Sequence, residues 1–147
     1  MDIESYLSGY ADSEGCFCIT INKSKRHKFG WELRPSFSVS QNHDRAEILE
    51  LYQKVFKCGS IRPDRSDKTL KYEVRSIVDL MNKIIPHFEK YPLLSSKKND
   101  FVEFAKVCEI MKDKKHLTRD GFNQVMTLAK QVNISGKKKY IRELIKI

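Results

Sequence analysis

The apolar residues of this chain change their spacing at Gly15, and this change constrains the fold more than any other feature. Before it, the apolar residues of segment 3–13 recur with the period of an amphipathic helix. After it, segment 16–24 alternates between apolar and polar side chains, which is typical of a half-buried strand. The sequence therefore predicts a short helix that ends at Gly15 and continues directly into a strand.

The succession of one helix and two strands occurs twice along the chain. The pattern predicts a basic hairpin (23–30), three more strands (32–40, 60–65, 69–75), four more helices (44–58, 76–85, 97–113, 118–133) and a basic amphipathic segment (137–147). We expect Pro86 to end the helix at 76–85. This order predicts a single α+β domain over residues 1–147, with an α-ββ-α-ββ-α core, a four-stranded antiparallel sheet and extra C-terminal helices.

The chain is strongly basic, with 28 Lys and Arg against 19 Asp and Glu and a net charge of +9. This excess favours a polyanionic partner, either nucleic acid or an acidic lipid surface reached through segment 137–147. No apolar run approaches the ~18 residues that cross a bilayer, and the N-terminus lacks a basic presequence. We therefore expect no membrane partner, and a chain that is made where it acts or is moved there by other means. The compartment stays open, with an organelle (mitochondrion or chloroplast) and a bacterial cytoplasm as the candidates.

Each predicted strand carries one apolar face and one polar face. An antiparallel sheet with one solvated face gives this pattern with no function attached. The polar residues are also of the types that read base edges in a DNA major groove, and Arg26 and Lys28 of the basic hairpin are suited to phosphate contacts. The other predicted DNA-facing residues are Thr20, Asn22, Ser24, Glu32, Arg34, Ser36, Ser38, Ser40, Arg62, Asp64, Lys71, Glu73 and Arg75.

The first helix ends on two acidic residues, Asp12 and Glu14, and a carboxylate there opposes the helix dipole. One stripe of the same helix is suited to close packing against its own copy: Ser5, Ser8, Gly9 and Asp12. Such packing would bring two Glu14 carboxylates together and favour a divalent cation such as Mg²⁺ between them. Metal held this way beside DNA can hydrolyse a phosphodiester. The alternative is a solvated acidic turn.

Segment 7–15 reads Leu-Ser-Gly-Tyr-Ala-Asp-Ser-Glu-Gly and resembles the motif of the LAGLIDADG homing endonucleases. Three further segments resemble that family in the expected order. They are residues 38–41 with Arg45 at a strand end, residues 91–101 before a helix, and residues 111–121 in the C-terminal helices. The resemblance spans nearly the whole chain, from residue 5 to residue 135.

The resemblance implies roles for the motif residues. Glu14 matches the acidic metal ligand, a position where the family more often has Asp, and the main-chain carbonyl of Ser13 is the implied supporting ligand. Asp12 matches an acidic position that is structural. Gly9 matches the glycine that lets two motif helices pack closely.

The resemblance also implies three further residues of the catalytic centre. Gln41 matches a residue that positions water near the scissile phosphate, and Lys97 matches the basic residue near that phosphate. The neighbouring Lys98 leaves this register open by one residue, and the distance from Pro92 favours Lys97. Arg45 matches a basic residue that flanks the centre, with a phosphate clamp or a solvated side chain as the alternative.

Family members with one motif are homodimers, so the resemblance implies a homodimer that binds a long, near-palindromic duplex through two saddle-shaped sheets. It implies Mg²⁺-dependent, site-specific hydrolysis of both strands by an intron-encoded endonuclease, leaving cohesive 3′ overhangs. The alternative on the same scaffold is a binder that does not cut: a maturase that assists splicing of its intron RNA, or a DNA-binding regulator.

Overall fold

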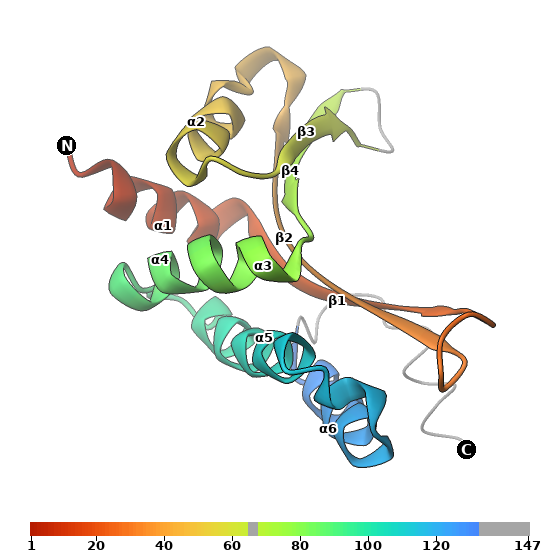
Figure 1. Cartoon of the computed structure of the whole chain (residues 1–147). Helices are drawn as coiled ribbons and strands as arrows, with labels where there is room; N and C mark the ends of the chain where they lie inside the picture. Colours follow the sequence, from red (N-terminus) through yellow and green to blue (C-terminus); the bar gives the residue numbers. More distant parts are fainter. Residues whose placement is uncertain (65–67, 133–147) are drawn as a thin grey trace.

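A computed structural model describes residues 1–64 and 68–132 of the chain (Figure 1). The predicted amphipathic segment at 137–147 lies outside the described residues. In chain order the elements are α1 (Ile3–Glu14), β1 (Gly15–Lys23), β2 (Trp31–Asn42), η1 (His43–Arg45), α2 (Glu47–Phe56), β3 (Ser60–Pro63), β4 (Thr69–Val74), α3 (Ile77–Asp79), η2 (Leu80–Ile84), α4 (Ile85–Lys90), α5 (Lys97–Lys112), η3 (Lys115–Leu117) and α6 (Arg119–Ala129). This order confirms the predicted α-ββ-α-ββ-α succession followed by helices.

The prediction that Pro86 ends a helix is wrong. The chain stays helical from Ile77 to Lys90, because η2 is a π-helical turn and Pro86 falls at the start of α4. The N–H of Ile85 donates to the carbonyl of Leu80, five residues earlier. At the start of a helical segment the N–H that proline lacks is not needed. The predicted start holds, since the Ser76 hydroxyl accepts from the N–H of Asp79.

Other boundaries also differ from the predictions. A 3₁₀ turn, η1, precedes α2, so that helix begins at Glu47 rather than residue 44. It ends before Lys57, which takes a left-handed conformation with φ 56°. The third strand, β3, stops at Pro63, and α6 stops at Ala129. These differences leave the order of the elements unchanged.

The four strands form one antiparallel sheet in the order β1-β2-β4-β3. The register places predicted polar-face residues on shared rows, with Thr20 opposite Arg34 and with Ser40, Lys71 and Arg62 in line. Because residues on one row of a sheet point to the same face, the register confirms that the strands share one polar face.

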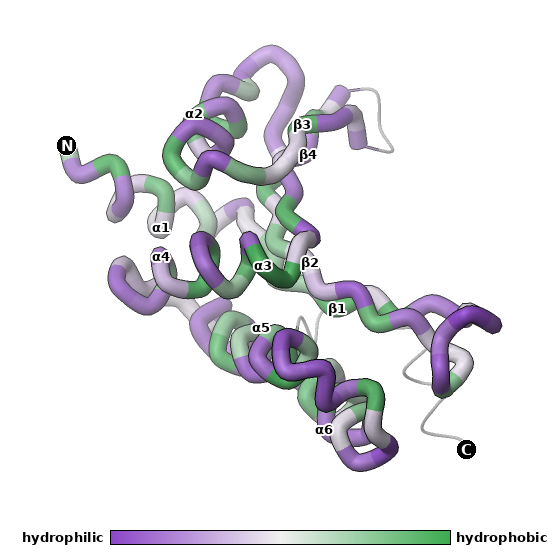
Figure 2. The backbone as a smooth tube through the Cα atoms, in the orientation of Figure 1, coloured by the Kyte–Doolittle hydropathy of each residue, from purple (hydrophilic) through white to green (hydrophobic). Residues whose placement is uncertain are grey.

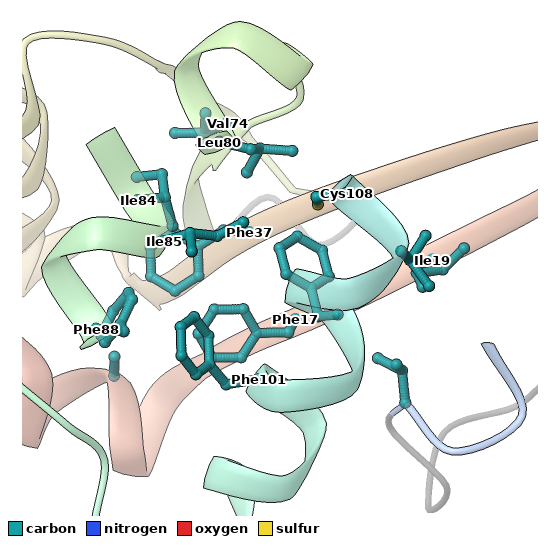
Figure 3. Close-up of a cluster of buried hydrophobic side chains, with 14 of the residues drawn as sticks. Phe17, Ile19, Phe37, Val74, Leu80, Ile84, Ile85, Phe88, Phe101 and Cys108 are labelled. Atoms are coloured by element: carbon teal, nitrogen blue, oxygen red, sulfur yellow. The ribbon is translucent and has the colours of Figure 1, made fainter. Parts of the chain in front are cut away.

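The apolar face of the sheet packs on the helices, and Phe17 of β1 lies at the centre of that core (Figure 3). Its ring centroid is 5.1 to 5.4 Å from those of Phe37, Phe88, Phe101 and Phe104. These rings come from β1, β2, α4 and α5, so one aromatic cluster joins the sheet to the helices that cover it.

The hairpin between β1 and β2 extends well beyond the other strands, and its tip is hydrophilic (Figure 2). Phe29 anchors it to α6, because the ring centroid lies 4.9 Å from that of Phe122 and the Arg119 guanidinium lies 4.6 Å away. The C-terminal helices therefore support the basic hairpin. Within the residues described, no helix is long and apolar enough to cross a membrane.

Candidate active site

The last turn of α1 carries Ser13 and Glu14, and both side chains are exposed. The helix passes into β1 without a loop, and the N–H of Gly15 donates to the carbonyl of Ala11. A Cβ at position 15 would lie 2.7 Å from that carbonyl oxygen, so the close turn depends on glycine. Within the described ranges, no hydrogen bond or ion pair engages the Glu14 carboxylate. The end of α1 therefore presents an acidic group that can take a ligand.

Lys97, the first residue of α5, places its ammonium group at the same end of α1. Its Nζ donates to the carbonyl oxygens of Ala11, at 3.0 Å, and Gly15, at 2.5 Å. A cation there offsets the negative end of the helix dipole. Lys98 is exposed. The geometry thus favours Lys97 over Lys98 as the basic group beside Glu14.

Asp12 of α1 forms hydrogen bonds to the segment before α5. Its carboxylate accepts from the N–H of Leu94 at 2.7 Å and from the Ser95 hydroxyl at 2.5 Å. Burial alone would raise the pKa of Asp12, but these hydrogen bonds, the Ser95 N–H and the charge of Lys97 outweigh burial and lower it. The carboxylate is engaged within the chain, in agreement with the structural role expected for it, and it fixes the segment that delivers Lys97.

Gln41 lies at the end of β2 and contacts α1 one turn before Glu14. Its Nε2 donates to the Tyr10 hydroxyl, and its Oε1 accepts from the N–H of Asn42 at 2.7 Å. Tyr10 precedes Glu14 by four residues, so both lie on one face of the helix. Tyr10 was not among the site residues predicted from the sequence. The sequence does show an aromatic residue four positions before Glu14, and that spacing could have indicated a position on the same face of the helix.

Arg45 is not brought to the end of α1. It lies on η1, its side chain is 68% exposed, and its Nε is 3.9 Å from the Asp44 carboxylate. In the ranges that the structure describes, no hydrogen bond joins it to α1. Its place agrees with the alternative of a phosphate clamp or a solvated side chain.

A divalent cation at this site would find one carboxylate in one chain, that of Glu14. No group of three or more His, Cys, Asp and Glu side chains gathers among the described residues. Mg²⁺ keeps several of its waters and is held by one or two carboxylates. The exposed Glu14, unengaged among the described residues, fits such an ion.

The polar face of the sheet begins where α1 ends, and its centre is less open than the sequence predicts. Ser36, Ser38 and Glu73 lie on the expected face but are only 6 to 9% exposed. The expectation of a fully solvated face is wrong for these three. Glu73 lies against the arginines Arg62 and Arg75, and alternation fixes the face of a side chain but not its depth.

The acidic residues of this face are paired with basic neighbours. The Glu32 carboxylate lies 2.5 Å from Arg34, and the Asp64 carboxylate lies 3.9 Å from Lys71. Ser24, predicted to be in a strand, instead lies in the hairpin turn, where its hydroxyl is 2.8 Å from His27 Nδ1. Arg26 and Lys28 are exposed there, and Thr20 and Arg34 are exposed on the strands.

The comparisons with known proteins identify this architecture. A family model described as LAGLIDADG endonuclease matches residues 7–108, which include α1 from Leu7 onward, the whole described sheet and Lys97. This chain belongs to the LAGLIDADG endonuclease family. A relative named "Probable intron-encoded endonuclease 2", from Neurospora crassa, is 36% identical over 123 residues. The match covers 83% of this LAGLIDADG chain but 27% of the relative, so the chain spans about a quarter of the relative's length.

Two solved structures of homing endonucleases share the fold. The homing endonuclease I-TnaI superposes with a TM-score of 0.89 at 26% identity, over 97% of this chain and 95% of the other. I-SmaMI, bound to an uncleaved DNA target in the presence of calcium ions, gives 0.89 at 28% identity, over 99% of this chain and 49% of the other. The predicted α+β LAGLIDADG fold is confirmed.

The predicted packing stripe of the LAGLIDADG helix needs one correction. Ser8 is 4% exposed, because its hydroxyl donates to the carbonyl of Tyr91 at 2.6 Å and lies 3.0 Å from His87 Nε2. Its side chain faces α4 of its own chain and not the exposed stripe. Ser5 and Gly9 are exposed, while Asp12 is held by Ser95.

The burial of His87 predicts a loss of stability in acid. Burial lowers the pKa of His87 to about 4, with a smaller opposing effect of Asp2, against 6.5 for a solvated histidine. Between these values the unfolded chain binds more protons than the folded chain, so stability falls as the pH drops. We expect a loss of about 2 kcal/mol between neutral pH and pH 5, measured by urea unfolding.

A matched pair of variants isolates this effect. His87→Gln should remove most of the pH dependence between pH 5 and neutrality, whereas His43→Gln, which changes an exposed histidine of η1, should leave it intact. An unchanged slope in His87→Gln would assign the acid sensitivity to another group.

Proposed function

We propose that this chain is a homing endonuclease that cuts both strands of a specific DNA duplex with the help of Mg²⁺. One observation carries the proposal: α1 presents an unengaged carboxylate, Glu14, beside the Lys97 ammonium, at the edge of a polar sheet face. The relative from Neurospora crassa is named an intron-encoded endonuclease, and I-SmaMI was crystallised on DNA with calcium. An origin in an intron of an organellar genome is part of the same proposal.

The polar face would hold the duplex and the end of α1 would face the cleaved phosphates. The exposed Arg34 on β2 and the hairpin residues Arg26 and Lys28 are suited to contacts with base edges and phosphates. Lys97 would stabilise negative charge on a phosphate oxygen, and Gln41 would orient a water through its amide. Bound Mg²⁺ would supply Lewis-acid stabilisation of the attacking and leaving oxygens, held by Glu14 and the Ser13 carbonyl.

Cutting both strands needs two such centres, and the motif occurs once in this sequence. We infer that two copies pair through the exposed face of α1, around Gly9, and place two Glu14 residues side by side on a near-palindromic site. Staggered cuts would leave cohesive 3′ overhangs. Glu14 favours the nuclease over a maturase or regulator that only binds, because a binder gains nothing from an acidic helix end facing phosphates.

The test is cleavage of a randomised duplex library by the full chain. We expect a defined set of double-strand cuts in Mg²⁺ and none in EDTA, with activity restored when excess Mg²⁺ is added back. Equal cutting in EDTA would refute the metal dependence. Binding without any cutting, under all metal conditions, would favour the alternative of a nucleic-acid binder that does not cleave.

A further inference from the structure

The polar face holds one carboxylate that binds two arginines at once, and this cluster differs from the other ion pairs of the sheet. Glu73 Oε1 lies 2.9 Å from a terminal nitrogen of Arg62 and 2.6 Å from Nε of Arg75. The glutamate is 9% exposed, whereas the two arginine side chains are 45% and 46% exposed. The carboxylate is thus covered and the guanidinium groups remain accessible.

The cluster lies close to the end of the motif helix. Glu73 shares a row of the sheet with Cys16, Ser38 and Ser60. Cys16 follows Glu14 by two residues, so this row is near the proposed centre of cleavage. Arg62 and Arg75 also line a surface hollow of about 320 Å³. The arginines therefore border open space at the end of β4, next to the start of α3.

The geometry leaves Arg75 ready to read a base. Its Nε forms an ion pair with Glu73, and neither terminal nitrogen makes a hydrogen bond among the described residues. Two adjacent N–H donors of this kind match O6 and N7 of guanine in the major groove. An arginine that is already held in place loses less side-chain entropy when it binds. The cluster keeps a net charge of +1, from two arginines and one glutamate, which suits a polyanion.

We propose that Glu73 is a positioning residue for DNA recognition: it aligns Arg75, with Arg62 as its second partner, to select guanine at a base pair near the cleaved phosphates. This assignment rests on the proposed function. It replaces the expectation from the sequence that Glu73 itself faces the bases, because a buried carboxylate occupied by two arginines does not present itself to a cytosine amino group.

The test compares base preference in Glu73→Gln and Arg75→Ala. The full wild-type chain first selects a consensus from a randomised duplex pool by binding in EDTA. Each base pair of the consensus is then changed in turn, and binding is measured for every variant. Glu109→Gln, which removes the same charge from the exposed side of α5, is the matched control.

We expect Glu73→Gln and Arg75→Ala to lose about tenfold in discrimination at the same base pair, and the double variant to lose no more than either. Glu73→Gln should bind unrelated duplexes as well as wild type or better, since a negative charge is gone. A loss of cytosine preference at a different base pair would make Glu73 a direct reader. A change in affinity that is uniform across all duplexes and equal to that of Glu109→Gln would mean that Glu73 acts only through its charge. Either result overturns the proposal.

Two further outcomes distinguish failure of this proposal from failure of the proposed endonuclease function. If wild type enriches no sequence, the proposed function fails and the role of Glu73 in recognition fails with it. If Glu73→Gln does not fold, NMR on the wild-type chain tests whether Glu73 holds Arg75 in place. The Nε–H group of Arg75, assigned with Arg75→Lys, should show a higher NMR order parameter than that of exposed Arg26, because the ion pair with Glu73 restrains the guanidinium. Equal order parameters would overturn the positioning role.

Discussion

Glu14→Gln is expected to abolish cleavage of the selected duplex while DNA binding is kept or strengthened. The substitution preserves the size of a side chain that is exposed and unengaged in the chain, so the fold has no reason to change. It removes the charge that holds a divalent cation, and loss of such transition-state stabilisation costs about a thousandfold in rate or more. It also removes an acidic group that opposes both the helix dipole and the DNA phosphates.

The measurement pairs single-turnover cleavage with equilibrium binding on one duplex. Glu4→Gln is the matched control, because it changes the same residue type at the opposite end of α1. That variant should cut like wild type and lose only a few tenths of a kcal/mol in stability. Cleavage within tenfold of wild type in Glu14→Gln would remove Glu14 from the catalytic centre, and lost binding would mean that it positions DNA instead.

Periodicity predicted the elements of the fold because it records which face of each element is buried. The change of period at Gly15 located the junction of α1 and β1 to within one residue. Pro86 shows the limit of this reasoning. A proline predicts the end of a helix from a missing N–H, but the π-helical η2 places it at the start of a further helical segment, where that N–H is not required.

Only part of the candidate site could be predicted from the sequence, because local patterns do not record contacts between distant segments. The family resemblance pointed to Glu14 and Lys97, while the contacts around the end of α1 depend on segments far apart in sequence. Lys97 reaches the Ala11 carbonyl across 86 residues, and Ser8 turns toward His87 across 79. Helical periodicity places Ser8 and Gly9 near one another on α1, but only the position of α4 decides which of the two is buried.

Gly9→Phe is expected to convert the proposed dimer to monomers without unfolding the chain. Gly9 is exposed in the middle of α1, and a Cβ built there meets no atom within 4 Å. A glycine inside a helix costs roughly 0.5–1 kcal/mol relative to alanine, and nothing in the described part of its own chain requires it. A two-fold axis at this point would explain the glycine, because each helix would then meet its own copy and any side chain would hold the backbones apart.

Sedimentation velocity measures the result, and thermal unfolding checks the fold. Gln124→Phe places the same aromatic on an exposed position of α6 and should leave the dimer intact. Because the space around Gly9 within the chain is open, a monomeric Gly9→Phe that unfolds at or above the wild-type temperature assigns the effect to contact between copies. A dimer unchanged by the substitution would place the interface elsewhere. A wild-type chain that sediments as a monomer on its own DNA site would leave two Glu14 carboxylates without a means of meeting, and the homodimer would have to be abandoned.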